Sequence, residues 1–174
     1  GPLAQLLGHR GGEPTFPEET LRAMVKRVYD LGVPLNYHAN GDAAIDMLFR
    51  AHEWAAADDP RKERNVTVIH AQFSRKDQVA KYVEYSMTPS FYTLHTYYFA
   101  DAHIANRGPE QAAYISPMRD AIDAGLHPTN HTDFVVAPLD QMFMLWSAVN
   151  RISRSGDVIG EGQRVGSLEG LKAQ

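Results

Sequence analysis

The chain has 174 residues, of which 44% are hydrophobic and 22% are charged, so its composition is that of one globular domain with a packed core. The formal net charge is −4 and the 17 lysine and arginine residues are scattered, which argues against a surface for nucleic acid or for an anionic membrane. The absence of cysteine excludes disulfides, zinc–thiolate sites and thiol nucleophiles, so any metal ligands must be His, Asp or Glu.

No apolar run is long enough to span a bilayer, and the first residues lack the charged and apolar regions of a signal peptide. We therefore expect a cytoplasmic protein without a membrane partner. Residues 1–16 are rich in glycine and proline and predict a loop, whereas residues 17–174 predict four β/α units.

A helix is expected at the start of the folded region. Apolar residues recur at helical spacing from Leu21 to Leu31, and Gly32 is a typical end for such a helix. Four short apolar stretches then predict strands, and helical spacing returns after each of them. The expected strands cover residues 33–39, 66–70, 86–90 and roughly 126–132.

The connections between these elements carry their own signals. Asp42 and Ser74 each follow a predicted strand and are candidate N-caps for the next helix. A long aromatic loop, residues 91–99, follows the third strand. The helical pattern of residues 110–124 is interrupted at Pro117, where a break is expected.

Strands that alternate with helices predict an α/β fold with a parallel sheet and right-handed crossovers. Four such units make about half of an eight-stranded barrel, so a partial TIM-type (β/α) barrel is one candidate architecture. A small doubly wound sheet is the other, and periodicity alone favours neither.

Three polar residues, His38, His70 and Asp133, each stand at the carboxyl end of a predicted strand. The carboxyl ends of parallel strands meet at one edge, where α/β enzymes build their sites. Because imidazole and carboxylate groups are ligands that zinc favours, we interpret these residues as metal ligands. The competing interpretation is that they are hydrogen-bonded rim residues of a non-catalytic α/β binding module.

Two further histidines are candidate substrate-binding residues. His131 lies two positions before Asp133, so both side chains face the same side of a regular strand. It could be a ligand, a partner of a ligand, a substrate contact or a buried barrel residue. His95 lies within the aromatic loop, whose composition suits a pocket wall but also a loop that packs on its neighbours.

Other catalytic patterns are poorly represented. The sequence has no Gly-x-Ser-x-Gly elbow of a serine hydrolase, no GxxxxGK phosphate loop and no GxGxxG turn after a strand. No pair of carboxylates stands at two strand ends, as a glycosidase would require.

Several motifs together resemble the amidohydrolase superfamily, over nearly the whole chain. The order and spacing are most similar to its type-3 branch, which includes N-substituted formamide deformylases. The matching segments are His38-Ala39-Asn40-Gly41-Asp42-Ala43-Ala44, Ile69-His70-Ala71-Gln72, Arg107-Gly108-Pro109-Glu110-Gln111-Ala112, His131-Thr132-Asp133 with Pro138 downstream, and Leu145 to Arg151.

The resemblance implies a distorted TIM barrel of which this chain contains roughly strands five to eight. It also implies that His38 and His70 bind metal, and that Asp133 both binds metal and acts as the general base. The implied cofactor is one or two divalent metal ions, most often zinc. The implied reaction is hydrolysis of an amide or formamide-like C–N bond in a small molecule, with a cyclic amide as the alternative substrate.

The sequence departs from the commonest family pattern in two ways. Ile69 stands where many relatives have Glu, and His131-Thr132-Asp133-Phe134 replaces the usual Gly-Ser-Asp-Ala, which we interpret as altered substrate selectivity. The family's first-strand His-x-His pair and its fourth-strand bridging ligand are not found before His38. We therefore expect a C-terminal half-barrel whose metal site is incomplete, and which is inactive unless the rest of the polypeptide or a second copy closes the barrel.

Overall fold

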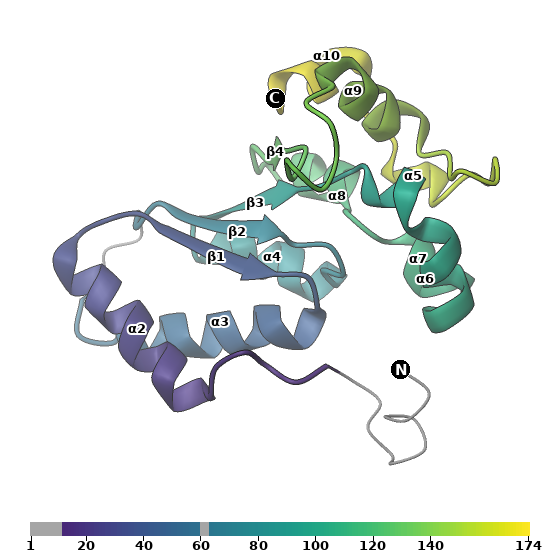
Figure 1. The fold of residues 1–174 in the computed structure, drawn as a ribbon. Coiled ribbons are helices and arrows are strands. Elements are labelled where there is room, and N and C mark those ends of the chain that lie inside the picture. The colour runs from purple at the N-terminus through teal and green to yellow at the C-terminus, as the bar shows by residue number, and fades with distance from the viewer. Residues whose placement is uncertain (1–11, 60–62) are drawn as a thin grey trace, which may run out of the picture.

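The computed structural model describes residues 12–59 and 63–174, which form a four-stranded parallel sheet with helices packed against it (Figure 1). The predicted loop over residues 1–16 lies largely outside the described residues. The first elements are α2 (Glu18–Leu31), β1 (Leu35–Ala39), α3 (Asp42–Ala55), β2 (Val66–His70), α4 (Lys76–Glu84) and β3 (Met87–Phe91). They are followed by α5 (His95–Tyr98), α6 (Ala100–Arg107), α7 (Pro109–Ala113), α8 (Met118–Asp123), β4 (Thr129–Asn130), α9 (Gln141–Asn150), η1 (Glu161–Gln163) and α10 (Ser167–Lys172).

The strands lie in the order β1-β2-β3-β4, and each pairs in parallel with the next. Consecutive strands that are also spatial neighbours, joined through helices, are the arrangement of a (β/α) barrel rather than of a doubly wound sheet, in which the strand order reverses. The predicted class is therefore confirmed as α/β with a parallel sheet, and its topology fits a partial TIM-type barrel.

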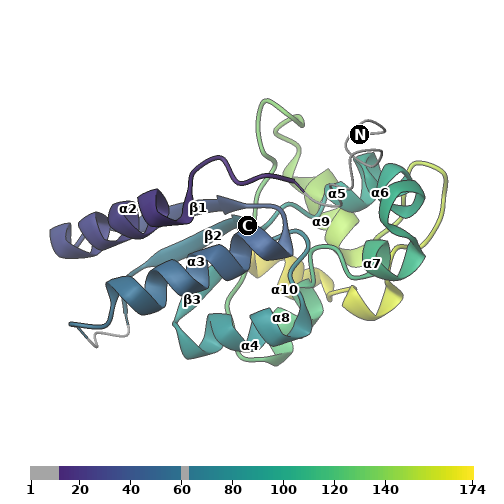
Figure 2. The ribbon, with the colours of Figure 1, turned by 90° about the horizontal axis from the view of Figure 1, so that it is seen from below.

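Helices α2, α3 and α4 cover one face of the sheet (Figure 2). Their apolar stripes and the helix-facing side chains of the strands form a single core, which also includes residues of α8. The largest contributors are buried almost completely: Val25, Ile45, Leu48, Phe49, Val68, Tyr82, Met87 and Met118. Burial of apolar area on this one face fixes the strand register, because a slip by one residue would turn these side chains outward.

The opposite face of the sheet is open at β1. Burial alternates along that strand, with Asn36 and His38 exposed and Ala39 buried. Among the described residues, no helix has the length and apolar character needed to cross a membrane.

The remaining helices gather beyond the carboxyl ends of the strands. Figures 1 and 2 both place α5, α6, α7 and α9 past the strand arrowheads, and not over the sheet. The aromatic loop predicted over residues 91–99 is partly helical, since it contains α5. These segments surround the edge at which the candidate metal ligands lie.

Three local predictions need correction. Strand β4 has only two residues rather than about seven, because Pro128 has no N–H to donate to a ladder and the N–H of Asn130 donates to the carbonyl of Ala173, 2.7 Å away. The predicted N-caps Asp42 and Ser74 are not N-cap residues in the structure. Gly41 and Arg75 occupy the N-cap positions of α3 and α4. The Ser74 hydroxyl instead donates to the Ala71 carbonyl, and the predicted helix break at Pro117 is confirmed.

Candidate metal centre

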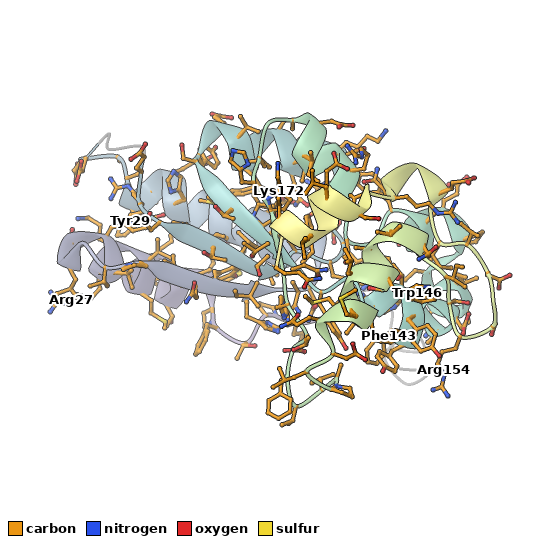
Figure 3. The ribbon with its side chains drawn as sticks, turned by 90° about the horizontal axis from the view of Figure 1, so that it is seen from above. Arg27, Tyr29, Phe143, Trp146, Arg154 and Lys172 are labelled. Atoms are coloured by element: carbon orange, nitrogen blue, oxygen red, sulfur yellow. The ribbon has the colours of Figure 1, made fainter. Side chains whose placement is uncertain are left out.

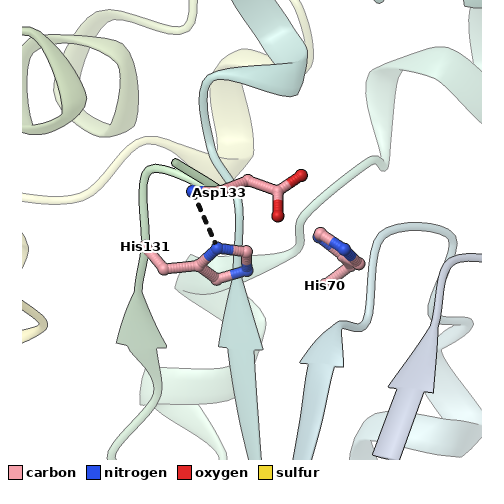
Figure 4. Close-up of side chains that lie close together, drawn as sticks. All are labelled: His70, His131 and Asp133. Atoms are coloured by element: carbon pink, nitrogen blue, oxygen red, sulfur yellow. Dashed lines mark hydrogen bonds between the residues drawn. The ribbon is translucent and has the colours of Figure 1, made fainter. Parts of the chain in front are cut away.

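His70, His131 and Asp133 converge at the carboxyl ends of β2 and β4 (Figure 4). Each residue offers one potential ligand atom, and these atoms all lie within 4.8 Å of one another. His70 is the last residue of β2, whereas His131 and Asp133 follow β4. Two predicted ligands and one predicted substrate-binding residue are thus brought together.

The orientation of His70 depends on an unusual backbone conformation. The register pairs Ala39 with His70 and His38 with Ile69, so regular strands would direct His38 and His70 to opposite faces of the sheet. His70 has a φ of 72°, in the left-handed region, and its side chain therefore leaves the regular alternation. The rings of His38 and His70 consequently meet edge to face with centroids 4.6 Å apart.

Asp133 is held in a similar way. Its φ is 53°, and its backbone N–H donates a 3.1 Å hydrogen bond to Nδ1 of His131. Left-handed backbone at a residue other than glycine costs on the order of 1–3 kcal/mol and gathers at functional sites. This conformation orients the His70 and Asp133 side chains, but it also occurs at Ala71 and at four described residues elsewhere, Asn65, Ser86, Ser116 and Arg151, so by itself it does not mark the site.

Burial favours the neutral form of His70 and of His131. Burial, reinforced by the neighbouring His131 and His38, lowers the pKa of His70 to about 4, although the Asp133 charge opposes the shift. The pKa of His131 is also lowered, mainly by burial. A neutral imidazole has a free lone pair on one nitrogen, which is the form that binds metal ions.

Unpartnered polar atoms provide a test of whether a metal fits. Among the described residues, Nδ1 of His70 is buried and makes no hydrogen bond. A buried polar atom without a partner is costly, and a cation would satisfy this lone pair. His70 and Asp133 supply an imidazole and a carboxylate, ligand types that catalytic zinc uses, and so fit such an ion. The predicted ligand His38 contacts the ring of His70, but it does not belong to the group whose ligand atoms all lie within 4.8 Å of one another.

His131 is positioned differently from a typical ligand. A histidine that binds metal usually donates its second ring N–H to a backbone carbonyl or carboxylate. Nδ1 of His131 accepts a hydrogen bond instead, so the neutral ring carries its proton on Nε2. His131 lies close enough to His70 and Asp133 to be counted with them as a potential ligand. In this tautomer, however, its Nε2 is a hydrogen-bond donor and not a ligand atom.

His95, the other predicted substrate-binding residue, begins α5 and is only 8% exposed. Its ring centroid lies 5.7 Å from that of His70 and 4.4 Å from that of Tyr92. Burial, with the nearby His70, lowers its pKa, and its Nδ1 is buried with no hydrogen-bond partner among the described residues. The structure thus places His95 beside the cluster, on the side of the aromatic segment.

Sequence reasoning did not single out Tyr92 or Asn130. Tyr92 directly follows β3, is fully buried, and stacks on His131 with ring centroids 5.7 Å apart and an interplanar angle of 23°. Burial and the Asp133 charge raise the pKa of Tyr92 to about 12. The Asn130 side chain accepts from the N–H of Thr93 and donates to its hydroxyl, and so joins the segment after β3 to β4. The aromatic run was a signal for Tyr92, whereas no local signal marks Asn130.

A second aromatic group lies further along the same edge, on α9. Phe143 and Trp146 point to the same side of that helix (Figure 3), with rings stacked at 11° and centroids 5.5 Å apart. Tyr97 packs edge-on against Phe143 at 4.8 Å. Aromatic rings therefore continue from the segment after β3 to α9, and a pocket wall formed by them stays a prediction.

A parallel sheet with histidine and aspartate side chains gathered at its carboxyl edge is the arrangement from which (β/α)-barrel enzymes build their sites. The sequence profile of the amidohydrolase family matches residues 2–174. The chain belongs to that family. No curated protein matches it.

Two solved structures are similar to the chain, both described as uncharacterised metal-dependent hydrolases. The protein from Pyrococcus furiosus is 25% identical with a TM-score of 0.74, and the similarity covers 92% of this chain and 31% of that one. The protein from Pyrococcus horikoshii OT3 is 21% identical with a TM-score of 0.76, and the similarity covers 93% of this chain and 32% of that one. At this identity the second similarity concerns the fold alone. The chain thus spans about a third of the length of these proteins.

Proposed function

We propose that this chain supplies metal ligands and the general base of a metal-dependent hydrolase that cleaves a C–N bond in a small amide. The observation that carries the proposal is the convergence of His70 and Asp133 at one point of the strand edge, each from a left-handed backbone position. The family membership and the description of the Pyrococcus furiosus relative support metal-dependent hydrolysis, and the C–N bond is the part that we add.

In this proposal His38, His70 and Asp133 hold the metal, which is zinc. The ring contact of His38 with His70 supports the two histidines as neighbouring ligands. The chain itself offers three ligands in this set, so one or more further ligands come from another part of the polypeptide or from water.

A divalent cation at these residues supplies a positive charge that lowers the pKa of a water molecule. Asp133 accepts a proton from that water as the water oxygen bonds to the carbonyl carbon. It then delivers the proton to the nitrogen as the C–N bond breaks, which yields a carboxylic acid and an amine. His95 lines the substrate pocket together with the aromatic segment.

The substrate proposed is an N-substituted formamide or a related acyclic amide, with a cyclic amide as the second candidate. The aromatic rings of Tyr97, Phe143 and Trp146 support an apolar substituent on the substrate, since flat rings provide a large apolar contact area. The predicted cytoplasmic location remains a prediction.

The two outer strands of the sheet, β1 and β4, suggest how the barrel closes. Each pairs with one neighbouring strand among the described residues. Unpaired strand edges promote association with further strands. We therefore propose that additional strands, from the same polypeptide or from a second copy, pair with these edges, and light scattering that shows a stable monomer of the isolated chain would argue against closure by a second copy.

The experiment that tests the function combines metal analysis with turnover. The full polypeptide is expected to hold one or two zinc equivalents by mass spectrometry and to hydrolyse members of a panel of formamides, N-acyl amines and cyclic amides. Asp133→Asn is expected to lower kcat by at least about 10³-fold without loss of fold, since general-base catalysis and metal binding both depend on this carboxylate.

Asp140→Asn is the matched control, because Asp140 lies in the following loop and caps α9 by accepting from the N–H of Phe143 at 2.9 Å. Asparagine is an equally good N-cap, so both activity and stability should be retained. A protein that binds no metal and cleaves no amide would instead be a non-catalytic α/β binding module.

A further inference from the structure

Tyr92 and His131 form a stacked pair whose polar ends lack partners. Both the hydroxyl of Tyr92 and Nε2 of His131 are buried and make no hydrogen bond with any described residue. The two rings lie nearly parallel, and both also contact His70, at centroid distances of 6.2 Å and 4.9 Å respectively. Two neighbouring rings at the candidate metal centre therefore each carry a buried polar group without a partner.

Both groups are hydrogen-bond donors. Nδ1 of His131 accepts a hydrogen bond from the N–H of Asp133, so the proton of the neutral ring is on Nε2. The phenol of Tyr92 carries its own proton. A bound cation would satisfy lone pairs but not these two N–H and O–H groups, so the pair requires an acceptor atom that the described residues do not supply.

Hydrogen bonds between the β3 and β4 segments hold the backbone that carries the two donors. The N–H of His131 donates to the Phe91 carbonyl at 2.9 Å, which extends the pairing of the two strands. The Asn130 amide clamps Thr93 by two hydrogen bonds of 3.1 and 2.8 Å. Tyr92 lies between the two residues that these contacts fix, so its ring has little freedom to find another partner.

We propose that the Tyr92–His131 pair binds the carbonyl oxygen of the amide and stabilises the negative charge that develops on it. The inference rests on the proposed function and adds to it a two-donor site formed by the ends of β3 and β4. Fixed donors directed at a developing oxyanion act more strongly in a buried site than in water, because they need no reorganisation as the charge forms. The requirement for an acceptor, the backbone held between β3 and β4 and the proximity to Asp133 all follow from this role.

The alternative is that the pair only packs against its neighbours. Leaving a buried hydroxyl without a partner is unfavourable, so pure packing predicts that phenylalanine would serve at least as well in every respect. The two explanations therefore give the same stability for Tyr92→Phe but different catalysis.

The test measures kcat, KM, zinc content and melting temperature for Tyr92→Phe and His131→Asn in the full, zinc-loaded polypeptide. Asparagine retains an acceptor near the position of Nδ1 and removes the Nε2 donor. Each variant is expected to lose about 10²-fold in kcat, the usual effect of removing one oxyanion donor, with KM changed less than about threefold. Zinc content should equal that of the wild type, and the melting temperature of Tyr92→Phe should not fall.

Tyr29→Phe is the matched control. Tyr29 is also buried, but its hydroxyl is hydrogen bonded to Nδ1 of His52 at 2.7 Å, at the opposite end of the sheet from α9 (Figure 3). This variant should retain kcat while its melting temperature falls by about 2–4 °C, which corresponds to the loss of one hydrogen bond in a domain of this size.

The outcomes separate the two levels of the proposal. An active wild type whose Tyr92→Phe variant keeps kcat within threefold would overturn the donor role and leave the hydrolase assignment intact. Loss of zinc would show that the Tyr92 hydroxyl acts on the metal site, and a fall in melting temperature similar to that of Tyr29→Phe would show that it has a structural partner; either result would overturn the donor role. A wild type that cleaves no amide would refute both.

Discussion

Arg151 offers a quantitative test of how the segments around the site are held. It follows α9, has no solvent exposure, and donates to four backbone carbonyls. The guanidinium bonds are 2.6 Å to Ile159, 3.1 Å to Ser116, 2.6 Å to Ile115 and 3.3 Å to Ala113. No ion pair to Arg151 occurs among the described residues. Residues 113–116, three of whose carbonyls accept from Arg151, are also connected to the loop after His70, because the N–H of Ser116 donates to the Gln72 carbonyl at 2.8 Å.

Arg151→Met removes all four donors and retains a long apolar side chain. Each carbonyl left buried without a partner costs about 1–3 kcal/mol, so losing the three shorter hydrogen bonds would cost roughly 3–9 kcal/mol. Part of this loss in the free energy of unfolding is offset, because the substitution also removes a buried charge that no carboxylate neutralises. Burial disfavours that charged form and lowers the pKa of Arg151 to about 9. We expect a net loss of roughly 2–4 kcal/mol in the free energy of unfolding, which is a fall of about 5–15 °C in melting temperature.

Urea denaturation followed by circular dichroism measures this loss. Arg154→Met is the control, because Arg154 lies three residues further along, is exposed at the surface (Figure 3), and should change stability by less than about 0.5 kcal/mol. If Arg151→Met remained within 0.5 kcal/mol of the wild type with an unchanged m-value, the four hydrogen bonds would not be needed and the reasoning would be wrong.

Three further predictions concern other parts of the chain. His70→Ala should reduce bound zinc to near zero by mass spectrometry, whereas His131→Asn should leave it unchanged, and equal losses would show that His131 is a ligand. Burial lowers the pKa of His52, so its contribution to stability is present above its ordinary pKa of 6.5 and is lost as the pH falls below it. Urea unfolding at pH 7.5 and 5.5 should show a larger difference for the wild type than for His52→Gln. Gly160→Ala should destabilise the protein by more than about 2 kcal/mol, because its φ is 63° and a Cβ would lie 1.7 Å from a backbone carbonyl oxygen, while Gly162→Ala, with open space around it, should be neutral.

The sequence predicted the strands best where local and tertiary preferences agree. Residues 66–70 are an apolar, β-branched run, and β2 has those bounds. The fourth strand was predicted too long, because its actual extent depends on which backbone groups find partners. The N–H of Asn130 bonds to Ala173, more than forty positions away in the chain, and no local pattern reports that contact.

The predicted caps failed for a related reason. Ser74 has the right chemistry for an N-cap, but its hydroxyl is held by the Ala71 carbonyl and lies 2.9 Å from the hydroxyl of Tyr82. Asp42 lies in the first turn of α3, where its carboxylate is 3.4 Å from the Arg75 guanidinium. A side chain that can cap a helix will do so only when no tertiary partner competes for it.

At the candidate site, the sequence predicts where the polar residues lie but not the directions in which their side chains point. Placing polar residues at strand ends needs only the strand pattern, and the sequence therefore identified His38, His70, His131 and Asp133. Their directions depend on φ, which a sequence pattern does not specify at residues other than glycine. Regular backbone would separate His38 from His70, and it is the left-handed φ of His70 that brings the two rings to 4.6 Å.

The roles of the grouped residues depend on one hydrogen bond. Had Nδ1 of His131 faced a carbonyl, its other nitrogen would carry a lone pair and the residue would be a third nearby ligand. Because Nδ1 instead accepts from the N–H of Asp133, the same imidazole presents a proton to the site. The left-handed conformation of Asp133 thus has two consequences, since it turns the carboxylate toward His70 and fixes the tautomer of His131. In the proposed site, the backbone conformation of one residue thereby decides which neighbour would bind the cation and which would donate to the oxyanion.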